Sequence, residues 1–431
     1  MYDTTPAFNL KAVLRETGLS ADALRAWERR YGLPRPQRSA GGHRLYSERD
    51  IATIKWLMAR QRDGLSISRA VELWNEQLAA GKDPLAAPLP SPAPGTAPST
   101  NLDRLRAQWL TACLNFDERQ AEQILNLAFS LYDVEAVCKD ILQKGIAEIG
   151  ELWYQNRATV QQEHFASALA LRRLDSLLAA SPPAVRPQTL LLGCPPNEWH
   201  TFTVLLLALL LRRRGWNVIY LGANVPVLQF QETIALTRAQ LVILVAQQLT
   251  TAASLYETAH HLASHHIRVA FGGRIFNIHP SLTRRIPGHY LGSTMDEAFQ
   301  QIETLILTNS PPRQPEPVEE EFGIALSWFQ SHRPQIEATF HQHIQNLGLS
   351  HIDLLAKIEF FGNNIAAALQ LGDMSLIDHE LDWLQSLLEA NHVPASTLSR
   401  FLQAYAHAVD LHINGSGKPI LDWIERFKGE P

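Results

Sequence analysis

The sequence has few cysteines and no long apolar run. Its 431 residues include three cysteines, Cys113, Cys138 and Cys194, whose spacing matches no metal site. So few thiols exclude a disulfide framework and predict a reducing compartment. The most apolar run, Val204–Leu211, is too short to span a bilayer and ends in three arginines. The first residues also lack a basic region followed by an apolar core, so we expect a cytoplasmic protein with no membrane partner.

An excess of basic residues is also lacking over the chain as a whole. There are 38 lysines and arginines against 43 aspartates and glutamates, and the formal charge of −5 alone argues against a nucleic-acid partner. Between residues 25 and 50, however, seven arginines stand against three acidic residues. A basic patch confined to one small module is typical of phosphate binding. We therefore predict that this segment contacts DNA.

Two segments unable to form a core divide the chain. Residues 81–101 are rich in proline, alanine, glycine and serine, and residues 309–321 are rich in proline and glutamate. Both compositions predict linkers. Because 431 residues are also too many for one ordinary core, we expect several domains. Their predicted bounds are 1–80, 102–183, 184–308 and 322–431.

The first 80 residues show the order helix, glycine turn, helix. A helical pattern begins at residue 8, and Ser20 is a good N-cap for a second helix over 21–31. Arginines on or near one face of that helix suit entry into a major groove. Gly41 and Gly42 predict the turn of a β-hairpin wing, and Ser47 caps a further helix through Arg62. The candidate DNA-contacting residues are Arg25, Arg29, Arg30, Arg38, His43, Arg44 and Tyr46.

The stretch LRAWERRYGLPRPQRSAGGHRLYSERD, which begins at Leu24, closely resembles the signature of the MerR family of transcriptional regulators. The resemblance covers about residues 7–76. It implies a winged helix-turn-helix that binds double-stranded operator DNA. It also implies a homo-oligomer, a dimer or tetramer, because such modules bind two half-sites. The alternative is that the arginines only solvate a helix face, but charge, turn glycines and wing coincide here.

The middle of the chain changes from one pattern to another. Residues 102–183 have helical periodicity and predict a small helical bundle, in which Trp153 is followed after nine residues by Glu163 and His164. Over 184–308, short apolar strands alternate with helices, which predicts a doubly wound parallel sheet of Rossmann-like α/β type. The predicted strands are 189–193, 217–222, 241–245, 268–273 and 289–292, with helices at 203–213, 230–237 and 254–263.

Two polar or glycine-rich segments follow strands of this sheet. Glu198 and His200 come after the first strand, and Gly272-Gly273 after the fourth. Sheets of this kind bind ligands beyond the carboxyl ends of their strands. A histidine there can bind a metal while the acid holds its other ring nitrogen, and paired glycines let a bulky ligand approach the backbone.

These segments resemble the cobalamin-binding fold, with its acid-x-His-x-x-Gly and later Gly-Gly. The Trp153-x9-Glu163-His164 spacing is similar to that of the CarH/LitR light-dependent repressors. The resemblance implies that His200 binds the cobalt of cobalamin and that Glu198 supports it. It also implies that Trp153, Glu163 and His164 shape a pocket for the 5′-deoxyadenosyl group of adenosylcobalamin, in a bundle that covers the upper face of the cofactor.

Three positions depart from that family's pattern. Thr203 stands where the family has glycine, and the serine expected after the third strand is absent. Gln247 or Gln248 could supply a polar contact there instead. Tyr154 stands where light sensors of the family have a histidine that captures cobalt after photolysis. The first two departures, Thr203 and the absent serine, motivate an alternative in which the regulator has lost its cofactor.

Residues 322–431 form an additional segment that predicts an all-α domain. The expected helices are 323–330, 333–347, 350–371, 375–390 and 395–413. One interpretation is a dimerisation or packing domain. The other is a second sensor for a tetrapyrrole such as haem or bilin, motivated by eight histidines: His332, His341, His343, His351, His379, His392, His407 and His412. No cysteine occurs in this segment, which excludes a thioether-linked chromophore there.

Together these features predict a cobalamin-dependent, light-responsive transcriptional regulator that is not an enzyme. A regulator that senses cobalamin without light shares all the motifs. A corrinoid methyl carrier would share the bundle and the α/β segment, but it gives the N-terminal module no role.

Overall fold

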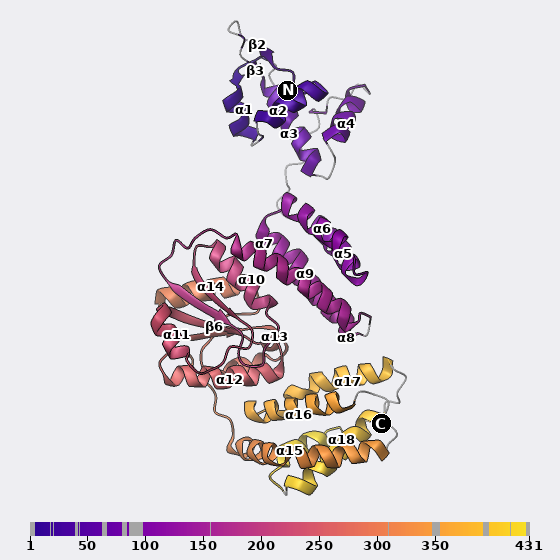
Figure 1. Ribbon diagram of the computed structural model, residues 1–431, viewed down its shortest axis with the longest axis vertical. Coiled ribbons are helices and arrows are strands. Elements are labelled where there is room, and N and C mark those ends of the chain that lie inside the picture. Colours follow the sequence, from indigo (N-terminus) through magenta and orange to yellow (C-terminus); the bar gives the residue numbers. More distant parts are fainter. Residues whose placement is uncertain are drawn as a thin grey trace. The chain divides into compact units, whose positions relative to one another are not determined.

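A computed structural model of the chain divides into two compact units, residues 1–101 and 102–431 (Figure 1). Among the described residues, no helix is both long and apolar enough to cross a membrane. The residues that the structure describes are 5–17, 19, 21–38, 42, 44–62, 67–79, 84–85, 98–155, 157–308, 310–346, 354–390, 396–413 and 415–427.

The first unit packs helices against a small antiparallel sheet of order β1-β3-β2. Its core includes Leu24 and Trp27, which bury the inner face of the predicted second helix. The Ser47 hydroxyl and the Asp50 carboxylate cap the start of the helix predicted to follow Ser47. The elements are β1 (Phe8–Asn9), α1 (Leu10–Thr17), α2 (Ala21–Tyr31), β2 (Gln37–Arg38), β3 (Arg44–Tyr46), α3 (Glu48–Arg62) and α4 (Ile67–Ala79).

The second unit begins with the helical bundle. Thr159 and Gln162 form a capping box that fixes the start of α9 just after a short loop from α8. The two helices therefore run in opposite directions, and the end of α8 lies beside the start of α9. The elements are α5 (Pro98–Leu114), α6 (Glu118–Leu131), α7 (Val134–Val137), a π-helical turn (Cys138–Gln143), α8 (Lys144–Tyr154) and α9 (Val160–Ala179).

A five-stranded parallel sheet follows, in the order β5-β4-β6-β7-β8, which confirms the predicted α/β pattern. Figure 1 shows α10 and α14 on one face and α11 and α12 on the other. The apolar run Val204–Leu211 is wholly buried in α10, which packs against the bundle helix α9. The elements are β4 (Thr189–Gly193), α10 (Phe202–Arg213), β5 (Asn217–Gly222), α11 (Phe230–Thr237), β6 (Ala239–Val245), α12 (Leu249–Ser264), β7 (Val269–Gly272), α13 (Arg274–Ile278), β8 (His289–Tyr290) and α14 (Met295–Thr308).

The C-terminal helices differ from the prediction at three places, one of which is that the predicted helix 375–390 begins with a 3₁₀ turn. The predicted break before Pro334 is wrong, because α15 continues through it. Pro334 lies on the exposed side of α15, while Phe329 and Ile336 on either side of it are buried in one core. A last helix was not predicted. The elements are α15 (Glu320–Asn346), α16 (Leu354–Leu371), a 3₁₀ turn (Met374–Ile377), α17 (Asp378–Ala390), α18 (Ser396–Ile413) and α19 (Lys418–Glu425).

Candidate functional site

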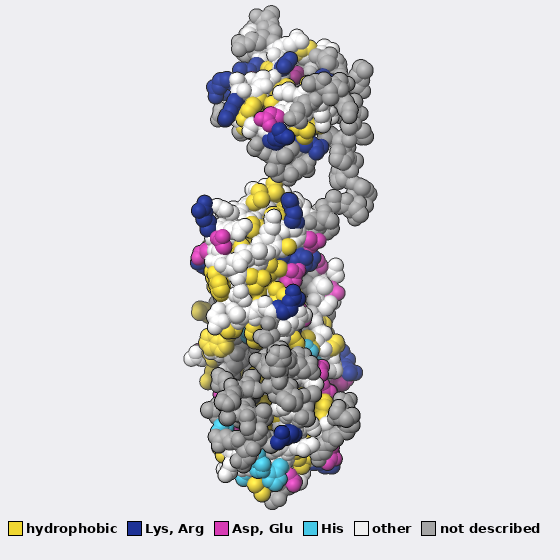
Figure 2. Space-filling view, turned by 90° about the vertical axis from the view of Figure 1, so that its right-hand side faces the viewer, with side chains coloured by type: hydrophobic (Ala, Val, Ile, Leu, Met, Phe, Trp, Pro, Cys, Tyr) yellow, Lys and Arg dark blue, Asp and Glu magenta, His cyan; other side chains and the backbone are white. Residues whose placement is uncertain are grey.

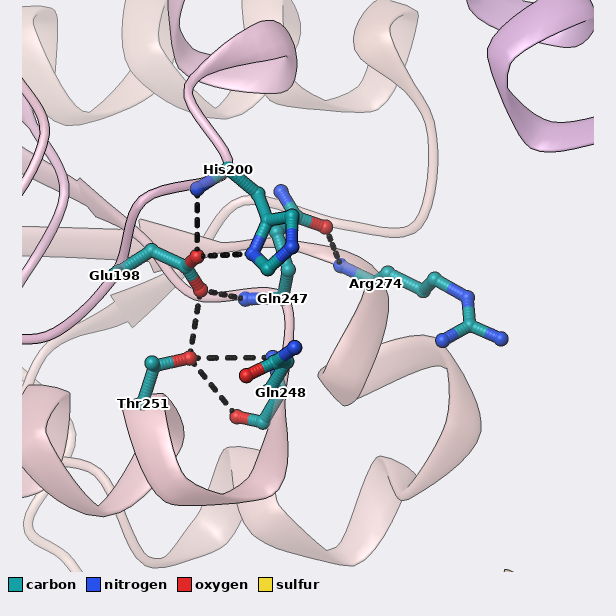
Figure 3. A network of polar contacts seen from close by, with 6 residues as sticks. All are labelled: Glu198, His200, Gln247, Gln248, Thr251 and Arg274. Carbon is teal, nitrogen blue, oxygen red and sulfur yellow. Dashed lines mark hydrogen bonds and ion pairs between the residues drawn. The ribbon is translucent and has the colours of Figure 1, made fainter. Parts of the chain in front are cut away.

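The loop after β4 holds a buried carboxylate beside an exposed imidazole. Glu198 is 0% exposed, and its Oε1 accepts hydrogen bonds from the backbone N–H and Nδ1 of His200, at 2.9 and 2.7 Å (Figure 3). The His200 side chain is 59% exposed. Nδ1 is thereby used, and Nε2 has no partner among the described residues. An imidazole held in this way presents its free nitrogen as a metal ligand.

The other carboxylate oxygen of Glu198 is held from the neighbouring strand. Oε2 accepts hydrogen bonds from the backbone N–H of Gln247 at 2.7 Å and from the hydroxyl of Thr251 at 2.6 Å. Gln247 follows β6 and Thr251 lies in the first turn of α12 (Figure 3). The order of the sheet reverses between β4 and β6, which is the position where open parallel sheets place ligands.

The two partners shift each other's pKa in opposite directions. Burial alone would raise the pKa of Glu198, but hydrogen bonds from His200, Thr251 and the Gln247 backbone outweigh it, so this pKa lies below its ordinary value. The hydrogen bond to Glu198 raises the pKa of His200, and burial only partly offsets the increase. A nearby carboxylate in the bundle, Glu163, raises the His200 pKa further.

The effect of Glu163 on His200 indicates that the predicted residues of the bundle, Trp153, Glu163 and His164, lie near the Glu198–His200 pair. Glu163 lies in the first turns of α9, where its Oε1 accepts a hydrogen bond from Ser167 and its Oε2 pairs with His164 Nδ1 at 2.7 Å. The His164 side chain is 75% exposed. Trp153, one residue before the end of α8, is 41% exposed although it is a large apolar residue. All three side chains therefore lie at the α8–α9 end of the bundle.

The paired glycines after β7 have different surroundings. At Gly273, with φ of +125°, an added Cβ would lie 1.9 Å from the carbonyl oxygen of Ala246. This position therefore requires glycine so that β7 can pass the end of β6. At Gly272 an added Cβ would meet nothing closer than Leu291 at 4.0 Å. The backbone approach made by Gly273 is thus to the protein itself.

The first unit exposes part of the predicted DNA-contacting set. Arg25, Arg29 and Arg30 are exposed on α2, and Figure 2 shows several lysines and arginines on the visible face of this unit. Arg44 pairs with Glu28 at 2.8 Å and keeps 38% of its side chain exposed. The side chain of Arg38 and the whole of His43 lie outside the described residues.

Tyr46 has a different position from the one expected. It is 0% exposed, and its hydroxyl donates to Glu28 Oε1 at 2.5 Å. Burial, followed by this hydrogen bond, raises the pKa of Tyr46. In this structure Tyr46 therefore supports Glu28 and, through it, Arg44, and is too deeply buried to form part of the surface.

Sequence reasoning did not single out Thr251. It lies 53 residues after Glu198, and no local spacing signals their contact. Gln247 was considered only as a possible side-chain contact, whereas its backbone N–H makes the bond to Glu198. The sequence identified Gly272-Gly273 after the predicted fourth strand. It gave no sign that the backbone of Gly273 packs closely against the carbonyl of Ala246.

Comparisons with known proteins match three parts of the chain. Residues 8–77 match the MerR HTH family regulatory protein model. Residues 105–178 and 188–300 each match a B12 binding domain model. In fold, the Methanosarcina barkeri monomethylamine corrinoid protein is similar, at 13% identity and a TM-score of 0.41, over 48% of this chain and 100% of that one.

Two curated relatives from Myxococcus xanthus are similar in sequence. The HTH-type transcriptional repressor CarA is 33% identical over 238 residues, which covers 54% of this chain and 75% of CarA. The HTH-type transcriptional repressor CarH is 32% identical over 226 residues, which covers 52% of this chain and 73% of CarH. The chain therefore belongs to the family of MerR-type transcriptional regulators with cobalamin-binding domains that includes CarA and CarH.

Proposed function

We propose that this regulator holds adenosylcobalamin between the bundle and the carboxyl edge of the sheet, and that light alters its binding to operator DNA. The observation that carries the proposal is the buried Glu198 bound to His200 Nδ1, which leaves Nε2 without a partner among the described residues. This donor set fits cobalamin, because a neutral imidazole with a fixed tautomer is a good ligand for a transition metal.

The chain's own residues would act from two sides. His200 would hold the cobalt, with Glu198 keeping the imidazole in the correct orientation and tautomer. Trp153, Glu163 and His164 would border the upper face, since they lie at the bundle end whose Glu163 charge reaches His200. When bound, adenosylcobalamin supplies a cobalt–carbon bond that light can break. The arrangement of bundle and sheet that binds the intact cofactor best would then no longer be stabilised by it, and the population of conformational states would shift.

The DNA-binding unit would use α2 in a major groove. Arg25, Arg29 and Arg30 are exposed there, and Arg44 is oriented by Glu28 next to the predicted wing, where Arg38 and His43 would add contacts. Such modules bind paired half-sites, so the active form is proposed to be a dimer or a tetramer. A change in assembly would then change the affinity for DNA.

The first test asks whether the purified chain binds cobalamin through His200. The wild-type protein should take up adenosylcobalamin and show cobalamin-like absorbance. His200→Ala should lose the imidazole-dependent part of that spectrum and bind more weakly by at least the roughly 10–100-fold that loss of an outer partner of a metal-binding histidine costs. His265→Ala, an exposed histidine at the end of α12, is the matched control and should behave as wild type. A colourless wild-type protein would exclude the proposal.

The second test separates light sensing from cobalamin sensing. DNA fragments selected by the protein from a random pool are titrated with adenosylcobalamin-loaded protein in darkness and after green illumination. Different affinities support light sensing, whereas identical affinities would point to a light-independent cobalamin sensor. Methyl transfer with a partner methyltransferase would instead support a methyl carrier. We propose no second tetrapyrrole, because the aromatic residues of the C-terminal helices pack on one another: Phe340, Phe361, Phe401, Tyr405 and Trp423.

A further inference from the structure

The C-terminal helices share a core with one face of the sheet. Helix α12 packs against α16, and the Gln370 side-chain amide donates to the carbonyl oxygen of Ala253 at 3.3 Å. Buried residues of α12 and of α15, α16, α18 and α19 belong to one continuous apolar cluster. Burial of this kind contributes most of the stability of a helix interface. The C-terminal helices are therefore fixed to the α/β part.

The same helix α12 begins at the candidate site. Thr251, in its first turn, donates to Glu198 at 2.6 Å, and Ala253 is two residues further along. A helix turn is stiff over such a short distance. The C-terminal helices thus rest on the element that holds the carboxylate beneath His200.

A second contact reaches the other side of the site, in the bundle. The hydroxyl of Tyr154, the last residue of α8, donates to the backbone carbonyl oxygen of His379 in α17 at 3.2 Å. The Tyr154 and His379 rings are 5.8 Å apart, and His379 lies 6.3 Å from the ring of His279, just after α13. Three parts of the second unit therefore meet at His379.

The start of α17 is itself firmly anchored. The Asp378 carboxylate accepts hydrogen bonds from Trp423 Nε1 at 2.8 Å and from Arg426 at 2.7 Å. Trp423 is buried in the core of the C-terminal helices. A displacement of α8 therefore cannot carry the first turn of α17 with it without breaking these bonds, so such a displacement would break the Tyr154–His379 contact instead.

Charged groups surround this junction. Burial raises the pKa of Glu380, and the neighbouring His379 and Arg274 partly offset the increase. The backbone N–H of Arg274 donates to the Gln247 side-chain oxygen at 3.1 Å, and the Arg274 side chain extends away from Gln247 in Figure 3. Gln247 in turn bonds Glu198. Arg274, whose charge acts on Glu380, is thus bonded through Gln247 to the carboxylate of the candidate site.

We propose that the C-terminal helices form a third wall of the cofactor site, and that the Tyr154–His379 contact is a latch that ties the α8 end of the bundle to α17, in addition to the packing of α9 on α10. This inference rests on the proposed function, since it assumes that cobalamin occupies the cleft. Tyr154 is a positioning residue, because it ties α8 to α17. Release of the cofactor requires the α8 end of the bundle to move away from the carboxyl edge of the sheet, so breaking the latch speeds release.

The experiment measures cobalamin release from the full-length protein in darkness. Tyr154→Phe keeps the ring and removes only the hydroxyl, and it should release cobalamin about three- to tenfold faster, the effect of one lost neutral hydrogen bond. Tyr256→Phe, on α12 beside His260, is the matched control and should release at the wild-type rate. His379→Ala keeps the accepting carbonyl and should fall between Tyr154→Phe and wild type.

Hydrogen exchange in residues 378–385 gives an independent readout. Cobalamin should slow exchange there in the wild type, and less in Tyr154→Phe, at equal thermal stability. If Tyr154→Phe released cobalamin at the wild-type rate, or if hydrogen exchange in this segment did not change on cobalamin binding, the latch would be overturned while the proposed function stands. A wild-type chain that holds no cobalamin would overturn both. Slower release by Tyr154→Phe would also refute the proposal, because the contact would then oppose binding.

Discussion

Replacing Thr251 by valine tests how the buried carboxylate is held. Valine has nearly the volume of threonine but no hydroxyl, so the change removes the hydrogen bonds of that group without leaving a large cavity. Two bonds are lost: the bond of 2.6 Å to Glu198, a charged group that is 0% exposed, and the bond of 3.1 Å that Thr251 Oγ1 accepts from the backbone N–H of Gln248 at the start of α12. A hydrogen bond to a charged group contributes about 1.5–3 kcal/mol and a neutral one about 1 kcal/mol, so we expect a loss of about 3 kcal/mol in the free energy of unfolding of the second unit.

The loss should depend on pH in a defined direction. The folded-state pKa of Glu198 lies below its ordinary value, so the stabilisation is present above the unfolded pKa and is lost as the pH falls through the folded one. Thr251→Val removes a hydrogen bond that lowers this pKa. The difference from wild type should be full at neutral pH and should narrow as the pH falls below the ordinary pKa of a glutamate toward the lower folded-state pKa of Glu198.

The assay is local hydrogen exchange in β4, β6 and α12, together with the cobalamin dissociation constant. Local exchange suits a chain with several domains, whose global unfolding need not be two-state. The control is Thr258→Val on the same helix, since Thr258 is equally buried but donates only to the Ser254 carbonyl. It should cost about 1 kcal/mol or less, without pH dependence below neutrality.

Cobalamin binding should respond in the same order. Loss of a direct partner of a metal-binding histidine weakens affinity about 10–100-fold. Thr251 acts on His200 indirectly, through Glu198. We therefore expect the cobalamin dissociation constant to rise about three- to tenfold in Thr251→Val and to stay unchanged in Thr258→Val. If the two variants were equal in stability and in affinity, the hydroxyl of Thr251 would have no special part in holding Glu198.

Two other changes test the DNA-contacting helix α2 and the glycine that follows β7. Arg29→Ala should weaken binding to all DNA sequences about equally and reduce the salt dependence of binding by about one phosphate contact. Arg119→Ala, at an exposed position in the bundle, should change neither. An unaltered salt slope for Arg29→Ala would contradict a phosphate contact. Gly273→Ala should destabilise the second unit by about 3 kcal/mol or more, because its Cβ would collide with the Ala246 carbonyl. Gly150→Ala in α8, where a Cβ meets nothing within 4 Å, should be stabilising by about 0.5–1 kcal/mol, and thermal unfolding compares the two.

The helices and strands were predictable where the hydrophobic periodicity of the local sequence, or a helix-capping residue, is enough to define them. The alternation of short apolar strands and helices needs only local sequence, and β4 and β5 have the predicted bounds. Helix α2 likewise follows its predicted bounds. The predicted break at residues 331–332 was wrong, although proline ordinarily has a large cost inside a helix and Pro334 follows that break. There the apolar residues on both sides pack into one core, and packing outweighs that local cost.

The DNA-contacting set shows a similar limit. Charge and turn glycines indicate a basic module, and three arginines of α2 are indeed exposed. Sequence alone cannot tell that Tyr46 faces inward, because β3 is only three residues long and its alternation is too short to assign a face. The structure assigns it through the pairing of β3 with both neighbouring strands and the bond to Glu28.

The sequence by itself determined the kinds of chemistry this protein carries: a basic helix-turn-helix module, an acid and a histidine after a strand, and paired glycines after another. Those are local features, set by neighbouring residues. Only the tertiary structure decided that Thr251 and Gln247 secure Glu198, and that Tyr154 meets His379 over a separation of 225 residues. Such contacts depend on strand order and on helix packing, which bring together residues that no local pattern connects.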